Sequence, residues 1–294
     1  MHRKKRDSIP TAPVLPESAV AAVGADSGIT QTCLARPPLW HNFSMTEDRK
    51  SLTRLYFPGQ IADHGECILP PAQAHHVARV LRLKAGDEVT MFDGSGAEYP
   101  AAIVRLDRSA VTLRVGEPRE RDRESPLAIS LAQAISSGER MDYTVQKAVE
   151  LGAVRIEPLL SSRCVVRLAG ERALRRAAHW QAVAVAACEQ CGRNRVPEIA
   201  PVMAFGDWLG RQSGADERWR LLLAPHTGVR LRELARPAGA ITLLVGPEGG
   251  FTPEEEDAAR LAGFSPVRLG PRVLRTETTA VAALAALQTL WGDL

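Results

Sequence analysis

Two strand–loop–helix transitions lie within residues 243–279, and they constrain the fold more than any other part of the chain. The apolar run Ile241–Val245 is rich in β-branched residues and ends at Gly246, which predicts a buried strand followed by a turn. Gly249 and Gly250 follow, and glycine permits both unusual backbone angles and the close approach of a ligand. The pattern therefore predicts a ligand-binding loop at the end of a strand.

Three residues indicate where the helix after this loop begins. Thr252 is a typical N-cap residue, Pro253 suits the first helical position, and Glu255 stands where the partner in a capping box is found. Gly263 is expected to end this helix.

The second transition repeats the layout with different residues. Residues 267–271 predict a short strand and a turn, and residues 276–279 precede a run of Ala, Val and Leu that reaches Trp291. Leu284 and Leu287 follow helical spacing, yet the opposite side of this helix is small and apolar as well. A helix without a polar face is usually buried all round, either in a core or against a partner chain.

Composition bounds the class of protein. The chain has 294 residues, of which 45% are hydrophobic, enough for one large domain or two. No apolar run approaches the roughly 18 residues of a membrane span, and the basic start of the chain is not followed by the apolar segment of a signal peptide. These features predict a soluble, cytoplasmic protein with no membrane partner.

The charge balance is less informative about partners. The net charge is only +3, which does not by itself require nucleic acid. Of the 37 basic residues 32 are arginine, whose planar fork suits phosphates and base edges better than lysine does. Codon bias in a GC-rich genome would produce the same preference.

The five cysteines are odd in number and sparse, which argues against a disulfide framework. Cys188 and Cys191 form a CxxC pair, but a zinc site would need a second pair, and a thioredoxin-like motif would follow a strand. Because this pair stands at the end of a predicted helix, packing is favoured over metal binding. No metal is expected.

Three segments of the chain differ in pattern. Residues 1–50 lack sustained periodicity, so they are expected to be disordered or to reflect a misassigned start, with Met45 as an alternative initiator. Residues 51–118 predict a small β-barrel, with strands at 88–92, 98–104 and 110–115, a hairpin turn at 93–96 and a helix at 73–83. The charged run 117–125 is interpreted as a linker.

From residue 126 to residue 294 strands alternate with helices. Strands are expected at 127–134, 154–159 and 221–223, and helices at 140–151 and 172–190. This alternation implies an α/β domain around a largely parallel sheet. Ligands bind at the carboxyl ends of such strands, where both loops lie and where His226 could line the site.

The GPEGG loop at residues 246–250 leaves alternatives open. Glycine loops before helices often bind phosphate, but no GxxxxGK[ST] or GxGxxG is present, and Glu248 would place a carboxylate beside the phosphates. A structural turn without a ligand is also compatible with the pattern. The carboxylate favours a cationic or hydroxyl-bearing ligand.

Five motifs, in order, carry a resemblance to a known family. They are GERMDYTVQKAVELG, SSRCVV, ACEQCGRNRVPEI, LLVGPEGGFTPEE and LGPRVLRTETTA. With them, residues 54–294 resemble the SPOUT methyltransferases, specifically the RsmE-type small-subunit ribosomal RNA uracil N3-methyltransferases. The resemblance implies a PUA-like RNA-binding barrel, an α/β domain with a C-terminal trefoil knot around S-adenosylmethionine, and a homodimer. Its implied substrate is a uridine of 16S ribosomal RNA in the small subunit.

The resemblance also implies roles for individual residues. The cofactor would be held by three loops, through Ala224, Pro225, Gly246, Pro247, Glu248, Gly249, Gly250, Leu269, Gly270, Val273 and Leu274. Arg275, Thr276 and Glu277 would face the target base. The chemistry of the reaction makes Arg275 the candidate to stabilise negative charge on that base, and Glu277 would accept a proton or cap the last helix. RNA contacts are expected at Arg54, Arg79, Arg82 and Arg140. Residues 1–50 have no counterpart in the family.

Two rival classes remain at this point. One is a non-catalytic RNA-binding or ribosome-assembly factor, which the intact GPEGG and RTETT motifs argue against. The other is a nucleotide-dependent α/β enzyme, which the missing phosphate-binding motifs disfavour.

Overall fold

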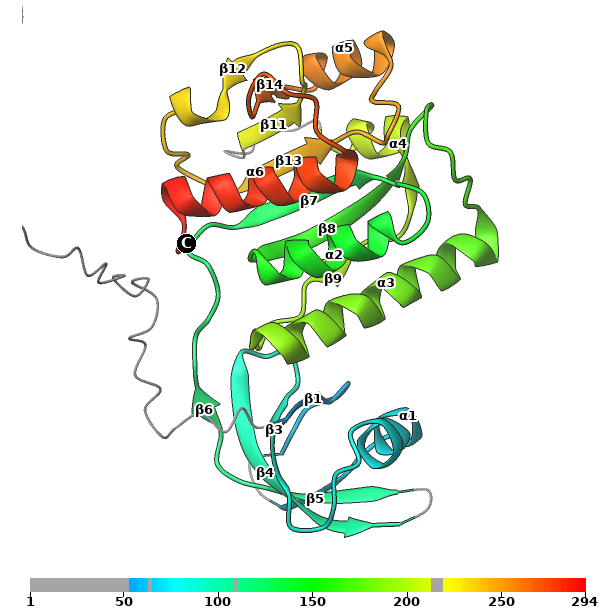
Figure 1. Ribbon diagram of the computed structural model, residues 1–294, viewed down its shortest axis with the longest axis vertical. Coiled ribbons are helices and arrows are strands. Elements are labelled where there is room, and N and C mark those ends of the chain that lie inside the picture. Colours follow the sequence, from blue (N-terminus) through cyan, green and yellow to red (C-terminus); the bar gives the residue numbers. More distant parts are fainter. Residues whose placement is uncertain (1–52, 63–64, 108–109, 213–218) are drawn as a thin grey trace, which may run out of the picture. The chain divides into compact units, whose positions relative to one another are not determined.

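The computed structural model describes residues 53–62, 65–107, 110–212 and 219–294 (Figure 1). The chain divides into two compact units, Met1–Arg49 and Lys50–Leu294. The first unit lies outside the described residues. The prediction that residues 1–50 are disordered concerns this same segment and stays a prediction. All the described helices and strands belong to the second unit.

The N-terminal part of this unit is a mostly antiparallel sheet. Its order is β1-β3-β4-β5-β2, and β6 pairs with β4. Only β1 and β3 run parallel among these described pairs. The elements are β1 (Thr53–Tyr56), β2 (Gly65–Ile68), α1 (Pro71–His75), a π-helix (His76–Val80), β3 (Glu88–Phe92), β4 (Ala97–Leu106), β5 (Val111–Val115) and β6 (Arg119–Glu120).

The predicted hairpin is confirmed, because Phe92 of β3 pairs with Glu98 of β4. Two predictions in this part are corrected. The helix expected over 73–83 begins at Pro71, changes to π-helical bonding and ends at Val80. The charged run 117–125 is more than a linker, since β6 adds a short strand to the edge of β4.

The C-terminal part is an α/β domain around a parallel sheet, as predicted. The order is β10-β8-β7-β13-β11-β14-β12, with β9 beside β8. Its strands are β7 (Ile129–Ala134), β8 (Ala153–Leu160), β9 (Glu198–Ile199), β10 (Met203–Ala204), β11 (Trp219–Leu223), β12 (Val229–Arg230), β13 (Ile241–Val245) and β14 (Ser265–Arg268). Its helices are α2 (Arg140–Glu150), α3 (Gly170–Cys191), α4 (Phe205–Gly210), a 3-10 turn (Leu231–Glu233), α5 (Pro253–Leu261) and α6 (Thr276–Trp291).

The central strands of this sheet are buried on both faces. Every residue of β7 and of β13 is buried, which explains why β13 is apolar at every position but Thr242 rather than alternating. Helix α2 packs against both α3 and α6 (Figure 1). Full burial of a side chain such as Leu243 or Leu244 contributes about 1.5–3 kcal/mol. The strands that carry the loops are therefore rigid.

Helix α5 begins as predicted. Thr252 accepts a hydrogen bond from the backbone N–H of Glu255, the Glu255 carboxylate accepts one from the backbone of Thr252, and Pro253 is the first helical residue. Helix α6 differs, because it begins at Thr276 rather than near residue 280. The Thr279 N–H donates to the Arg275 carbonyl at 2.8 Å, so the threonines form the first turn.

The absence of a polar face on α6 has a partial explanation. Ala280, Ala283, Leu284 and Leu287 are fully buried in the core of their own domain. The other side of the helix is half-buried, and Leu290 near its end is 43% exposed. One face therefore belongs to the core, whereas the other is only partly covered within the described part of the chain. No helix in that part combines the length and hydrophobicity needed to cross a membrane.

Arg54 connects the small sheet to the α/β domain. Its guanidinium pairs with Glu98 at 2.9 Å, bonds to Asn194 after α3, and lies over the Phe92 ring at 4.8 Å. Only 11% of the side chain is exposed. Both Nη atoms of Arg54 are thus engaged inside the protein, and contact with RNA stays a prediction for this residue.

Candidate active site

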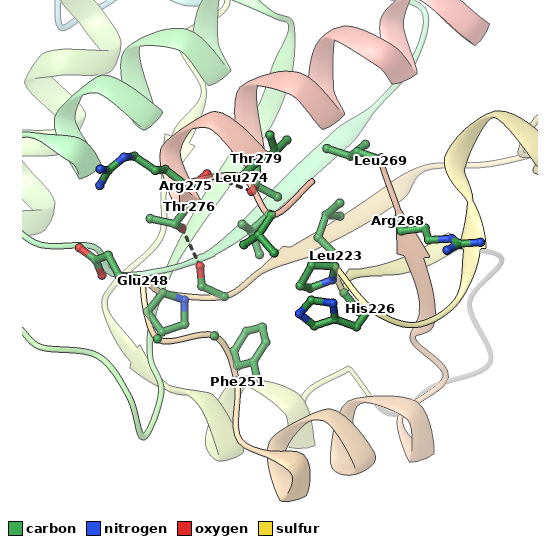
Figure 2. Close-up of a pocket in the computed structure, with 18 of the residues that line it drawn as sticks. Leu223, His226, Glu248, Phe251, Arg268, Leu269, Leu274, Arg275, Thr276 and Thr279 are labelled. Atoms are coloured by element: carbon green, nitrogen blue, oxygen red, sulfur yellow. Dashed lines mark hydrogen bonds between the residues drawn. The ribbon is translucent and has the colours of Figure 1, made fainter. Parts of the chain in front are cut away.

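Three loops at the carboxyl ends of neighbouring strands enclose a cavity of about 740 Å³ (Figure 2). The loops follow β11, β13 and β14, and the first turn of α6 completes the wall. All the residues expected to hold a cofactor line this cavity: Ala224, Pro225, Gly246, Pro247, Glu248, Gly249, Gly250, Leu269, Gly270, Val273 and Leu274. Arg140, His226, Arg275 and Glu277 line it as well. Residues separated by more than one hundred positions in the sequence thus meet at one site.

The loop after β13 needs glycine at two positions for different reasons. Gly250 has a φ of +67°, a left-handed conformation that other residues adopt at a cost. At Gly249, a Cβ atom would lie 3.2 Å from the Cβ of Arg163. The loop can therefore pass close to its neighbours while its backbone faces the cavity.

Glu248 ties this loop to the segment between β7 and α2. Its Oε1 accepts hydrogen bonds from the Ser137 N–H and hydroxyl, both at 2.8 Å, and from Arg140 Nη1 at 2.9 Å. Partial burial acts to raise the pKa of Glu248, but the bonds from Ser137 and Arg140 outweigh it and hold the pKa below its usual value. One carboxylate oxygen is thus committed to holding the loop.

Arg163 ties the same loop to the segment after β8. Its Nη1 donates to the carbonyls of Gly249 at 3.0 Å and Phe251 at 3.1 Å. The neighbouring Ser162 N–H donates to Glu255 at 2.7 Å. Sequence reasoning assigned no role to Arg163, although its position in SSRCVV, directly after a predicted strand, was an available signal.

A third tie comes from inside the sheet. Thr276 donates its hydroxyl hydrogen to the Gly246 carbonyl at 2.6 Å and accepts a bond from Gln133 Nε2 at 3.0 Å (Figure 2 shows the bond between Thr276 and the loop). Gln133 is fully buried. Its signal in the sequence was a second polar residue, besides Ser130, in a largely apolar strand.

Arg275 and Glu277 flank Thr276 but differ in environment. The Arg275 side chain is exposed and makes no hydrogen bond to any described residue. Figure 2 shows it extending from the start of α6 on the side of Glu248, away from His226 and Arg268. Glu277 is only 17% exposed, with Oε1 3.8 Å from Arg140 Nε. Its Oε2 is buried and has no hydrogen-bond partner within the described part of the chain.

The other predicted arginines are distributed differently. Arg79 and Arg82 are exposed around the end of the π-helix, outside this cavity. Arg140 lines the cavity and bonds to Glu248, so contact with RNA stays a prediction for it.

No group of three or more metal-ligating side chains occurs among the described residues. Cys188 is buried near the end of α3, and its thiol lies 3.6 Å from the Arg195 carbonyl. Burial, with a contribution from Cys191, raises the pKa of Cys188 to about 12. This cysteine therefore stays a thiol at neutral pH and packs at the end of the helix.

Comparison with known proteins shows which family has this architecture. The profile of an RNA methyltransferase domain matches residues 123–288, and that of an RNA methyltransferase PUA domain matches residues 69–116. The ribosomal RNA small subunit methyltransferase E of Buchnera aphidicola subsp. Schizaphis graminum is 32% identical, over 84% of this chain and 99% of its own length. The protein of that name from Synechocystis is 34% identical, over 76% of this chain and 72% of its own length.

Solved structures agree. Ribosomal RNA small subunit methyltransferase E from Neisseria gonorrhoeae, bound to S-adenosyl methionine, has a TM-score of 0.77 and 41% identity, covering 83% of this chain and 99% of that one. A Legionella pneumophila protein in complex with the same cofactor has a TM-score of 0.79 and 40% identity over the same shares. Fold and site together define an RNA methyltransferase that carries a PUA domain. Within that class, the chain belongs to the ribosomal RNA small subunit methyltransferase E family.

Proposed function

We propose that this protein transfers a methyl group from S-adenosylmethionine to N3 of one uridine in the 16S ribosomal RNA of the small subunit. The observation that carries the proposal is the convergence of three glycine-containing loops and the Arg275–Glu277 segment on a single cavity. The S-adenosylmethionine complexes of the similar Neisseria and Legionella structures support the choice of cofactor.

The cavity suits that cofactor in size and lining. About 740 Å³ lies within the roughly 300–1,000 Å³ of small-molecule sites. Leu223, Val267 and Leu269 supply apolar walls, and the loop at residues 246–250 supplies backbone polar groups. The loops would hold the adenosine and methionine parts. When bound, the cofactor supplies an electrophilic methyl group on a sulfonium.

Arg275 and Glu277 are assigned to the target base. N3 of uracil must lose its proton to attack the methyl group, and until the N–C bond forms the negative charge left on the base spreads to the two flanking oxygens. Arg275 is available for that charge because its guanidinium has no partner in the described chain. Glu277 has a buried oxygen free to accept the proton. A positioned donor of the Arg275 kind typically contributes about 10²- to 10³-fold in rate.

The small N-terminal sheet is assigned to RNA binding. We place the PUA-like domain at residues 51–118 and the methyltransferase domain at 126–294, and Arg79 and Arg82 are exposed on the former. The target base must leave its stack to expose N3, which favours a single-stranded or loosely paired site. Because the proposed substrate is ribosomal, we propose a cytoplasmic location.

The C-terminal segment is assigned to a trefoil knot. Strand β14 inserts between β11 and β12, both of which precede it in the chain. The chain then returns to Gly246, whose carbonyl accepts a hydrogen bond from Thr276, the first residue of α6. Knots are very rare among folds, so the support comes from this crossing and from the family.

We propose a homodimer in which a second copy of the chain covers the partly exposed face of α6. A largely apolar hollow of about 530 Å³ lies beside this face, lined by Leu231, Leu269, Pro271, Ala286 and Leu290 among others. A second copy of the chain would cover it. The hollow adjoins the cofactor cavity through Leu269 and Gly270, which line both.

Two measurements test the proposal against its rivals. Calorimetric titration should show binding of S-adenosylmethionine but not of ATP or NAD; the reverse would favour a nucleotide-dependent enzyme. Mass spectrometry of 16S ribosomal RNA from a deletion strain should show the loss of one N3-methyluridine, restored by the wild-type gene. Unchanged modification in that strain, with cofactor binding intact, would contradict the assigned substrate.

A further inference from the structure

We propose that Gln133 is a positioning residue for methyl transfer, which aligns the cofactor loop with the first turn of α6 through the hydroxyl of Thr276. The inference rests on the proposed function but concerns a residue that touches neither cofactor nor substrate. Gln133 does not line the cavity.

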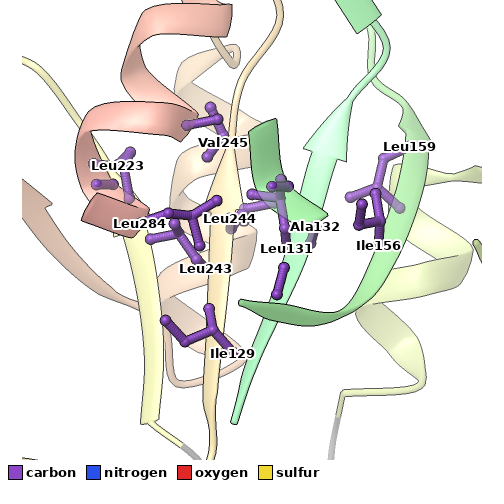
Figure 3. Packing of buried hydrophobic residues seen from close by; sticks show 14 of the residues in the cluster. Ile129, Leu131, Ala132, Ile156, Leu159, Leu223, Leu243, Leu244, Val245 and Leu284 are labelled. Carbon is purple, nitrogen blue, oxygen red and sulfur yellow. The ribbon is translucent and has the colours of Figure 1, made fainter. Parts of the chain in front are cut away.

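The place of Gln133 is determined by the sheet. It pairs with Val245 of β13 on one side and with Pro158 of β8 on the other. Figure 3 shows this region, with Leu131 and Ala132 of β7 packed near Leu243, Leu244 and Val245 of β13. Val245 is the last residue before Gly246, so the side chain of Gln133 lies where the cofactor loop begins.

The hydrogen bonds have one consistent direction. Gln133 Nε2 donates to the Ala134 carbonyl at 2.9 Å and to Thr276 Oγ1 at 3.0 Å, which uses both amide hydrogens at short range. Thr276 has a single hydroxyl hydrogen and gives it to the Gly246 carbonyl at 2.6 Å. Reversing the amide of Gln133 would direct its oxygen at a carbonyl, so this orientation is the one that bonds.

Burial keeps water from replacing either partner in these hydrogen bonds. Gln133 is 0% exposed and Thr276 is 6% exposed, so water is a poor substitute for either partner. The direct contact from Nε2 to the Gly246 carbonyl is longer, at 3.5 Å. The link to the cofactor loop therefore passes mainly through the threonine hydroxyl.

The position of Thr276 between the residues assigned to the base and the loop assigned to the cofactor links it to methyl transfer. Arg275 precedes it and Glu277 follows it, and these are the two residues assigned to the base, whereas Gly246 begins the loop assigned to the cofactor. In-line transfer depends on the alignment of the two groups, and a misplacement of about 1 Å can cost about 10²-fold in rate. A buried amide that joins both segments sets their separation.

The test is a double-mutant cycle on the full-length protein. Gln133→Leu and Thr276→Val should each slow single-turnover methylation of small subunits about 10- to 100-fold at saturating S-adenosylmethionine, with a much smaller change in cofactor affinity. The double variant should be no slower than the slower single variant. Multiplicative effects, or a full rate in Gln133→Leu, would overturn the proposal.

Thr242→Val is the matched control. Thr242 is a buried polar residue on β13, beside β7, whose hydroxyl bonds to no described residue. It should keep the full rate. If Gln133→Leu does not fold, Gln133→Glu takes its place, because it keeps the length of the side chain and loses N–H donors.

Amide hydrogen exchange separates this inference from the proposed function. Without RNA or cofactor, the amides of residues 246–251 and 276–279 should exchange faster in Gln133→Leu than in Thr242→Val. Equal exchange would count against Gln133. If the wild-type protein failed to methylate small subunits, the proposed function would fall, while exchange would still decide whether Gln133 aligns the two segments.

Discussion

Arg140 Nη1 lies 2.9 Å from Glu248 Oε1, a contact that ties the first turn of α2 to the loop after β13. On its other side, Arg140 Nε lies 3.8 Å from Oε1 of Glu277 in α6. One arginine thus contacts both the carboxylate that holds the cofactor loop and the carboxylate assigned to proton transfer. Its charge favours the ionised form of Glu248.

Replacing Arg140 with glutamine should weaken S-adenosylmethionine binding about fivefold, because the loop loses one of its ties and the pair is partly exposed. Isothermal titration calorimetry gives the measurement. Arg155→Gln is the control, since Arg155 is similarly exposed and pairs with Glu157 and Glu198 on the far strands of the sheet. Equal affinities of the two variants would show that the tie does not order the loop.

Acid should weaken the fold partly through Glu248. Its pKa is lower in the folded protein than in the unfolded chain, so its ionised form stabilises the fold above the ordinary glutamate pKa of about 4.3. That contribution is lost as the pH falls through the folded-state pKa. The difference in melting temperature between the wild type and Glu248→Gln should therefore shrink from neutral pH to about pH 3. A constant difference would contradict the assignment.

How far the sequence predicts this fold depends on where the deciding interactions are. The strand Ile241–Val245 and the start of α5 were predicted correctly because a buried run and a capping box are local patterns. The start of α6 was misplaced, since Thr276 enters the helix through its bond to Gly246, thirty residues away in the chain. Strand β6 was not predicted, because a charged sequence does not favour a strand by itself. These residues are extended because they pair with β4.

The site divides in the same way. The glycine loops and Arg275 were found by pattern and resemblance, and all of them line one cavity. The burial of Arg54 could not be predicted from the sequence, because its partners Glu98 and Asn194 lie 44 and 140 residues away in the chain. Gln133 and Arg163 donate to backbone carbonyls. Every residue has a carbonyl, so the sequence does not show which one a side chain will contact.

The dimer prediction is revised by the structure. Leu284 and Leu287 are buried in their own domain, so a charge there would unfold the chain rather than report on a partner. Leu290→Glu instead places a charge on the partly exposed face, where it should convert a dimer to a folded monomer. Sedimentation of the two proteins tests this, and a monomeric wild type would rule out the dimer.

The N-terminal segment lies outside the described residues, and its dispensability stays a prediction. It lacks the apolar periodicity needed to join a core. A chain that starts at Met45 should melt within about 2 °C of the full-length protein and methylate at the same rate. A large loss of either property on truncation would assign the segment a role.

The most direct test uses small subunits from a deletion strain, labelled S-adenosylmethionine and purified protein. The account predicts one methyl group per subunit, located by mass spectrometry at N3 of a uridine. It also predicts that Arg275→Ala binds the cofactor as tightly as the wild type but transfers the methyl group about 10²- to 10³-fold more slowly in a single turnover. No incorporation by the wild type, or an unchanged rate in the variant, would contradict it.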